Sequence, residues 1–121
     1  MSKAIVIHEQ GGPSVLQYEE IDVKKPEDGE VQIRHMAIGL NYIDVYHRSG
    51  LYPLPELPAI IGMEGAGVVE ALGNGVDNLS VGDRIAYAAP PPGAYTEIRN
   101  IAASNLVKLP ESISFEQGAA M

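Results

Sequence analysis

The chain of 121 residues is long enough for one domain of ordinary size and too short for two. Its 45 % hydrophobic and 20 % charged residues are typical of a globular protein and exclude global disorder. A formal net charge of -8 disfavours binding to nucleic acid, and the absence of cysteine excludes disulfides and thiolate metal sites. Because no apolar run approaches the roughly 20 residues of a bilayer span, we expect a soluble, cytoplasmic protein without a membrane partner.

Short runs rich in Val, Ile and Tyr alternate with turn-forming glycines and prolines, a pattern typical of a small barrel or sandwich. The predicted strands are residues 4–8, 16–23, 30–40, 65–72, 84–88 and 94–98. In the third of these strands, alternation predicts one face in the core and one face partly exposed to water. The core face is Val31, Ile33, His35 and Ala37, and the other face is Gln32, Arg34, Met36 and Ile38.

Residues 42–49 form the helix that the sequence predicts in the middle of the chain. Asn41 is a favourable N-cap, and Asp44 lies in the first turn, where an acid interacts with the positive end of the helix dipole. Asp44 and Arg48 have the i, i+4 spacing of a stabilising ion pair. Gly50 is expected to end the helix.

A second helix is predicted to begin at the capping box formed by Ser114 and Gln117. In this motif the serine hydroxyl accepts from the backbone amide of Gln117, whose side chain reaches back to the backbone of Ser114. The sequence stops at Met121, fewer than two turns later, and we interpret the chain as a fragment of a longer protein.

The three histidines, His8, His35 and His47, have spacings that match no zinc motif. We expect His8 and His35 to be strand residues with hydrogen-bond partners, and His47 to lie on the surface. The glycines of residues 62–67 lead into a predicted strand, whereas a dinucleotide-binding loop leads into a helix. Close approach of neighbouring backbones is the better interpretation of these glycines.

Residues 41–52 concentrate polar and aromatic side chains, including Tyr42, Tyr46 and Tyr52. Tyr42 and Tyr46 share one helix face, being four residues apart. These tyrosines could pack the helix onto the barrel. Alternatively, the Asn41 amide and the tyrosine hydroxyls could donate hydrogen bonds to a carbonyl bound in a cleft. The residue pattern alone leaves both interpretations open.

A resemblance to a known family rests first on residues 41–53, NYIDVYHRSGLYP, which are its most specific part. Further matches are Pro58-x-x-x-Gly62-x-Glu64-Gly65-Ala66-Gly67-Val68-Val69, Gly82-Asp83-Arg84, Gly93-Ala94-Tyr95 and residues 109–117. Over its whole length the chain resembles the amino-terminal half of bacterial NADPH-dependent quinone oxidoreductases. These enzymes are the zeta-crystallin-like, zinc-free branch of the medium-chain dehydrogenase/reductase superfamily.

The resemblance implies a mainly β, GroES-like barrel with one or two short helices. Residues 1–112 would form this catalytic domain, and residues 113–121 would begin the helix that leads into a Rossmann domain missing from the chain. The dimer of the family is built chiefly on that missing domain. Most NADPH contacts lie there too, so the chain alone is expected to be inactive.

The resemblance also implies which residues serve the reduction of a quinone by NADPH. Asn41, Tyr46 and Tyr52 would be the catalytic residues facing the substrate, with Asn41 and Tyr52 donating to the quinone oxygen. The cofactor-binding residues would be Tyr42, Ile43, Asp44, Val45 and Tyr46, along the nicotinamide.

No metal site is implied. In zinc-dependent relatives, the positions that match Asn41 and Met63 hold a zinc-binding cysteine and histidine. The position that matches Ile43 holds a proton-relaying serine or threonine. All three are replaced here, so we expect no zinc and no Lewis-acid mechanism.

Three other functions remain as alternatives. The first is NADPH-dependent reduction of the double bond of α,β-unsaturated carbonyls, which neighbouring zinc-free members perform. The second is a non-catalytic GroES-like binding module, although the tyrosine-bearing helix argues against a co-chaperonin. The third is RNA binding, which the net charge of -8 and the lack of a basic stripe disfavour.

Overall fold

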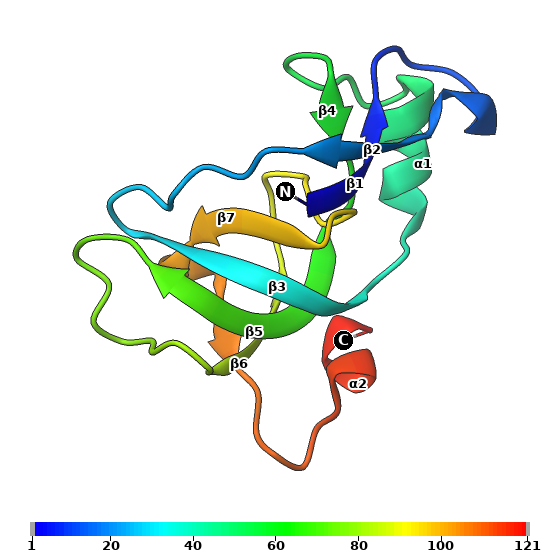
Figure 1. The fold of residues 1–121 in the computed structure, drawn as a ribbon. Coiled ribbons are helices and arrows are strands. Elements are labelled where there is room, and N and C mark those ends of the chain that lie inside the picture. Colours follow the sequence, from blue (N-terminus) through cyan, green and yellow to red (C-terminus); the bar gives the residue numbers. More distant parts are fainter. Residues whose placement is uncertain (1, 121) are drawn as a thin grey trace.

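A computed structural model describes residues 2–120, and its chain is mainly β, as predicted (Figure 1). A small antiparallel sheet has the strand order β2-β1-β4. Its strands are β1 (Ser2–Ile7), β2 (Gln17–Ile21) and β4 (Ala59–Ile60). Short 3-10 turns at Pro13–Val15 and Ala103–Asn105 complete the connections.

A larger antiparallel sheet of five strands holds most of the core, in the order β7-β3-β5-β6-β8. Its strands are β3 (Glu30–Ile38), β5 (Glu64–Leu72), β6 (Arg84–Ala88), β7 (Ile98–Ala102) and β8 (Val107–Lys108). Figure 1 shows that β5 curves strongly along its length. The centre of this core is Val31, Ile33, Val69, Ile85, Tyr87 and Ile101.

The predicted alternation along β3 is confirmed. Val31 and Ile33 are fully buried, whereas Met36 and Ile38 are exposed. The close approach predicted at the glycines of β5 is also confirmed. A Cβ at Gly67 would overlap the Arg34 carbonyl oxygen of β3, so β5 approaches the backbone of β3 too closely here for any side chain.

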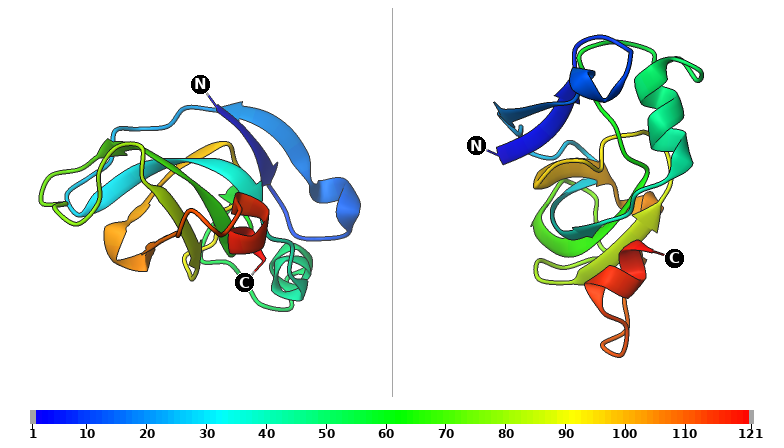
Figure 2. Two further views of the ribbon diagram at one scale, coloured as in Figure 1. Left: turned by 90° about the horizontal axis from the view of Figure 1, so that it is seen from below. Right: turned by 90° about the vertical axis from the view of Figure 1, so that its right-hand side faces the viewer.

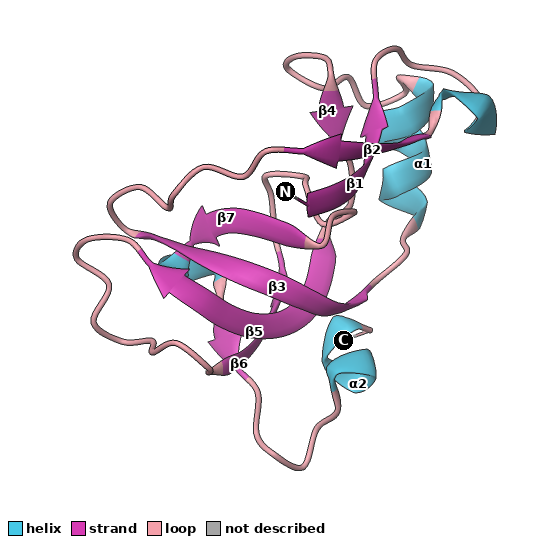
Figure 3. Cartoon of the chain, in the orientation of Figure 1, coloured by secondary structure: helices cyan, strands magenta, loops and turns pink. Residues whose placement is uncertain are grey.

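Both predicted helices are present (Figure 3). Helix α1 spans Tyr42–Ser49, as predicted, and Gly50 ends it with a φ of 93°. Helix α2 spans Phe115–Ala119 and has both bonds of its capping box, Gln117 N to Ser114 Oγ at 3.1 Å and Ser114 N to Gln117 Oε1 at 2.9 Å.

The views in Figure 2 show the two helices outside the sheets, at separate places. Helix α2 packs against β3, β5 and β6, and its Ala119 joins a small apolar cluster with Ala66, Ala86 and Leu109. The segment predicted to lead into a further domain therefore lies against the barrel.

The prediction of a strand at residues 94–98 is wrong. In this stretch Thr96 makes only an isolated bridge to Ala4, and the strand pairing with β3 begins at Ile98. The segment instead crosses between the two sheets. Its backbone bonds to both β1 and β3, through Ile5 N to Tyr95 O and His35 N to Glu97 O, each 2.8 Å.

Candidate functional site

Helix α1 has its polar side chains inside and several apolar side chains outside, the reverse of an ordinary surface helix. Asp44 is 2 % exposed and His47 is 9 % exposed, whereas Tyr42 is 83 % exposed and Val45 is also exposed. The interpretation that Tyr42 packs the helix onto the barrel is therefore wrong. The helix presents an apolar and aromatic face outward instead.

The buried Asp44 carboxylate ties the helix to the rest of the fold. Its Oδ2 accepts from the Tyr95 hydroxyl at 2.6 Å and from the backbone N–H of Asn41 at 3.1 Å. Its Oδ1 is buried without a hydrogen-bond partner. The predicted ion pair with Arg48 is not formed, because Asp44 points inward while the Arg48 guanidinium donates to Gly11 O at 3.2 Å.

Burial raises the pKa of Tyr95 above its usual value, and its hydrogen bond to the Asp44 carboxylate raises it further. The folded protein therefore keeps this phenol protonated at a pH where the unfolded chain has lost the proton. The stabilisation is complete below the unfolded pKa of about 10 and is lost as the pH rises above that value.

We expect Tyr95→Phe to lower the free energy of unfolding by about 2 kcal/mol at neutral pH, because Asp44 loses a donor while remaining buried. The variant should also lose less stability than the wild type above about pH 10. Chemical denaturation at pH 7 and at high pH measures both effects. The matched control is Tyr42→Phe, whose side chain is exposed; equal losses in the two variants would contradict the account.

The side chain of Asn41 is held by a second carboxylate. Its Nδ2 donates to Glu64 Oε1 at 2.9 Å, and Glu64 is only 9 % exposed. Asn41 therefore lies at the start of α1 with its backbone bonded to Asp44 and its side chain bonded to Glu64. Asn41 and Asp44 together form the capping box of α1.

Tyr46 and Tyr52 form a pair at the other end of α1. Their rings meet edge to face, with centroids 5.3 Å apart and planes at 76°. The backbone N–H of Tyr52 donates to Tyr46 O at 3.2 Å, which folds the chain back after Gly50. Tyr52 is 50 % exposed, so its ring is accessible from outside. Within residues 2–120, no hydrogen bond joins Asn41 to either tyrosine.

The predictions for His8 and His35 are confirmed in part. His35 lies on β3, and its Nδ1 donates to Thr96 O at 2.8 Å while its Nε2 accepts from the Tyr87 hydroxyl at 2.7 Å. Burial lowers the pKa of His35 to about 4, which matches a neutral ring. His8 follows β1 rather than lying in it, and its Nε2 is 2.6 Å from Glu19 Oε2.

The prediction that His47 is a surface residue is wrong. It lies one turn after Asp44 on the inner side of α1, with its Nδ1 buried and without a partner. Across the described residues, no group of three or more acidic or histidine side chains could hold a metal ion.

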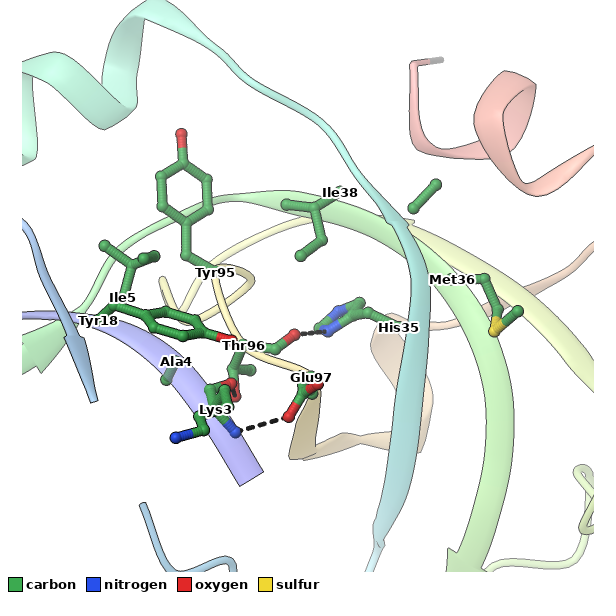
Figure 4. A pocket seen from close by; sticks show the side chains of 11 residues that line it. Lys3, Ala4, Ile5, Tyr18, His35, Met36, Ile38, Tyr95, Thr96 and Glu97 are labelled. Carbon is green, nitrogen blue, oxygen red and sulfur yellow. Dashed lines mark hydrogen bonds between the residues drawn. The ribbon is translucent and has the colours of Figure 1, made fainter. Parts of the chain in front are cut away.

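Two cavities flank the junction of the sheets, and the predicted site residues line neither. One, of about 350 Å³, lies between β1, β3 and residues 95–97 (Figure 4). The other, of about 630 Å³, lies between the small sheet, residues 54–60 and residues 91–100. The predicted site is thus the open outer face of α1 together with Asn41.

Sequence reasoning missed Glu64 and Tyr95 as partners of this site. Both residues lie inside the motifs that carry the family resemblance, which implies no role for either. The signal for Glu64 was a charged residue among the glycines of residues 62–67, because a buried carboxylate in a strand needs a hydrogen-bond donor.

The fold and site define a mainly β domain with one capped helix beside a small sheet. Residues 27–111 match the family described as the alcohol dehydrogenase GroES-like domain. The chain belongs to this family. No helix of residues 2–120 is both long and apolar enough to cross a membrane.

Three relatives are similar over almost the whole chain. A quinone oxidoreductase of Pseudomonas aeruginosa is 52 % identical over 121 residues, which cover 100 % of this chain and 37 % of that protein. The solved structure of an Escherichia coli quinone oxidoreductase complexed with NADPH is 47 % identical, with a TM-score of 0.94, and the match covers 97 % of this chain and 36 % of that one. A 2-haloacrylate reductase of a Burkholderia species is 42 % identical over 96 % of this chain and 36 % of that protein. The chain thus spans little more than a third of these relatives.

Proposed function

We propose that the protein containing this chain reduces quinones with NADPH and without zinc. The observation that carries the proposal is an exposed aromatic face on α1 beside an asparagine amide held by a buried carboxylate. The 52 % identity to a quinone oxidoreductase supports it. A flat quinone fits such a face, and the fixed amide offers a hydrogen-bond donor to its oxygen.

Asn41 and Tyr52 donate to the quinone oxygen as it gains negative charge. Asn41 is suited to this role because one of its N–H groups is engaged by Glu64, which leaves the other for the substrate. The Tyr52 hydroxyl is accessible on a ring that Tyr46 supports edge to face. Held donors of this kind stabilise developing charge without the cost of reorganisation.

The cofactor is expected along residues 42–46, with Tyr42, Val45 and Tyr46 as the contacting side chains. The exposed apolar face of α1 fits a nicotinamide ring, which needs a flat, dry surface. NADPH supplies the hydride when bound. The buried Asp44 carboxylate lies on the inner side of α1, where it holds the backbone N–H of Asn41.

Zinc does not fit the residues present. By the resemblance, Asn41 and Met63 would match the positions of two zinc ligands in zinc-dependent relatives, and the chain contains no cysteine. The Asn41 amide is already bonded to Glu64. A thioether and a carboxamide are poor substitutes for thiolate and imidazole ligands of Zn²⁺. Quinones tolerate this loss because they accept hydride readily.

The remaining parts of the proposal concern the whole protein. Residues 1–112 form the GroES-like domain, and residues 113–121 begin a connection to a nucleotide-binding domain that supplies most NADPH contacts. A homodimer forms through that domain. We propose a cytoplasmic location and no nucleic acid partner, in keeping with the net charge of -8.

A second candidate is reduction of an α,β-unsaturated carbonyl, favoured by the 42 % identity to a 2-haloacrylate reductase. Steady-state NADPH oxidation by the full-length protein distinguishes the two. We expect a higher kcat/KM with 1,4-benzoquinone than with 2-chloroacrylate or a simple enone. Turnover of the enone or haloacrylate without turnover of the quinone would assign the protein to the double-bond reductases.

A further inference from the structure

The carboxamide of asparagine has an oxygen and an NH2 group at its two ends, of nearly equal size. A rotation by 180° exchanges an acceptor for a donor at the same place. For Asn41 to donate to a substrate oxygen, some neighbouring group has to fix which end faces the site.

Glu64 can fix which end of the Asn41 carboxamide faces the site. A carboxylate only accepts hydrogen bonds, so the 2.9 Å contact of Glu64 Oε1 with Asn41 selects Nδ2 over Oδ1. Bonds between an N–H group and a carboxylate are about twice as strong as bonds between neutral groups. The flipped amide would set two oxygens against each other at this distance.

Glu64 is itself held in place. A Cβ at Gly39 would lie 2.5 Å from Glu64 Oε1 and 2.5 Å from the Ala119 carbonyl of α2, so the carboxylate occupies a narrow space that only glycine leaves open. The Gly39 N–H also donates to the backbone oxygen of Glu64 at 3.0 Å. The carboxylate therefore presents a fixed acceptor to Asn41.

We propose that Glu64 is a positioning residue that orients the Asn41 carboxamide, so that its second N–H faces the substrate. The inference rests on the proposed function and deepens it. Glu64 does not contact the quinone; it acts through Asn41. Its removal should therefore affect turnover only while Asn41 is present.

The test is a double-mutant cycle in the full-length protein with NADPH and 1,4-benzoquinone. Glu64→Gln keeps the size of the side chain but presents either an oxygen or an NH2 group, so this side chain no longer selects Nδ2 of Asn41 as its partner. We expect kcat to fall by about tenfold with an unchanged KM for NADPH. In the Asn41→Ala background, the same substitution should cause no further loss.

Glu70→Gln is the matched control, because Glu70 lies on the same strand and its Oε1 pairs with Arg34 Nε at 2.6 Å. It should leave kcat unchanged. A wild-type kcat in Glu64→Gln would overturn the inference, and so would losses that multiply with those of Asn41→Ala.

A second readout separates this inference from the proposed function. The side-chain amide resonances of Asn41 should shift in Glu64→Gln and not in Glu70→Gln, whether or not the protein reduces quinones. An inactive wild type with this shift would contradict the proposed function but retain the orienting contact. Unchanged resonances would overturn the inference in either case.

Discussion

Replacing Asn41 by alanine is expected to lower kcat/KM for 1,4-benzoquinone by about tenfold to a thousandfold, the range for loss of one donor to a developing oxyanion. The substitution removes the amide that Glu64 holds and leaves the exposed tyrosines in place. Alanine keeps the backbone N–H that donates to Asp44 Oδ2 in the capping box of α1, so the helix itself should remain. Steady-state kinetics of the full-length protein measure the effect.

Tyr52→Phe tests the second donor by the same assay, since it removes the hydroxyl and keeps the ring that packs on Tyr46. The control is Tyr18→Phe, an exposed tyrosine on β2. Wild-type rates in both Asn41→Ala and Tyr52→Phe would contradict the assignment of these donors. Circular dichroism confirms that each variant is folded.

Acid is expected to destabilise the fold through His35. The pKa of His35 in the folded protein is about 4, below the ordinary value of 6.5. Burial is the main cause, and the nearby positive charge of Arg99 lowers the pKa further. The hydrogen bond to Thr96 O acts in the opposite direction. Stability is therefore complete above the unfolded pKa and is lost as the pH falls from about 6.5 to about 4. The loss from this residue should reach about 3 kcal/mol at pH 4.

The hydrogen bonds of His35 explain why the folded protein disfavours the protonated ring. The Arg99 guanidinium donates to the Tyr87 oxygen at 3.2 Å, and the Tyr87 hydroxyl donates to His35 Nε2 at 2.7 Å. A proton on His35 Nε2 would point at the hydrogen of the Tyr87 hydroxyl, so Nε2 could no longer accept the hydrogen bond from Tyr87. The His35 ring lies where β3, β6 and residues 94–98 meet, so its protonation disturbs contacts between all three segments.

Chemical denaturation between pH 7 and pH 4 measures this effect. His35→Gln should be less stable than the wild type at pH 7 but lose about 3 kcal/mol less on acidification. His8→Gln, which changes an exposed histidine, is the control and should retain the loss that comes from His35. An equal loss of stability in His35→Gln and the wild type would exclude His35 as its source.

Local signals predicted the helices well. Asn41 and Gly50 fixed the ends of α1, and the capping box fixed the start of α2, because caps depend on residues a few positions apart. The alternation on β3 was equally readable from the sequence, since a half-buried strand has a period of two.

What the sequence could not provide were contacts between distant segments. The pairing of Asn41 with Glu64 joins residues 23 positions apart, and that of Asp44 with Tyr95 joins residues 51 apart. The inward direction of Asp44 and His47 follows from those contacts, so the helix pattern alone suggested a surface pair with Arg48 and an exposed histidine. The outer face of α1 is apolar, whereas an amphipathic surface helix has its polar side chains outside.

We propose quinone reduction by NADPH without a metal, at a site that this chain helps to form. The most direct test is NADPH oxidation by the full-length protein with 1,4-benzoquinone after dialysis against a chelator, with zinc measured in the same sample. We expect undiminished turnover in a sample that lacks stoichiometric zinc. Loss of turnover on chelation, restored by added zinc, would contradict it.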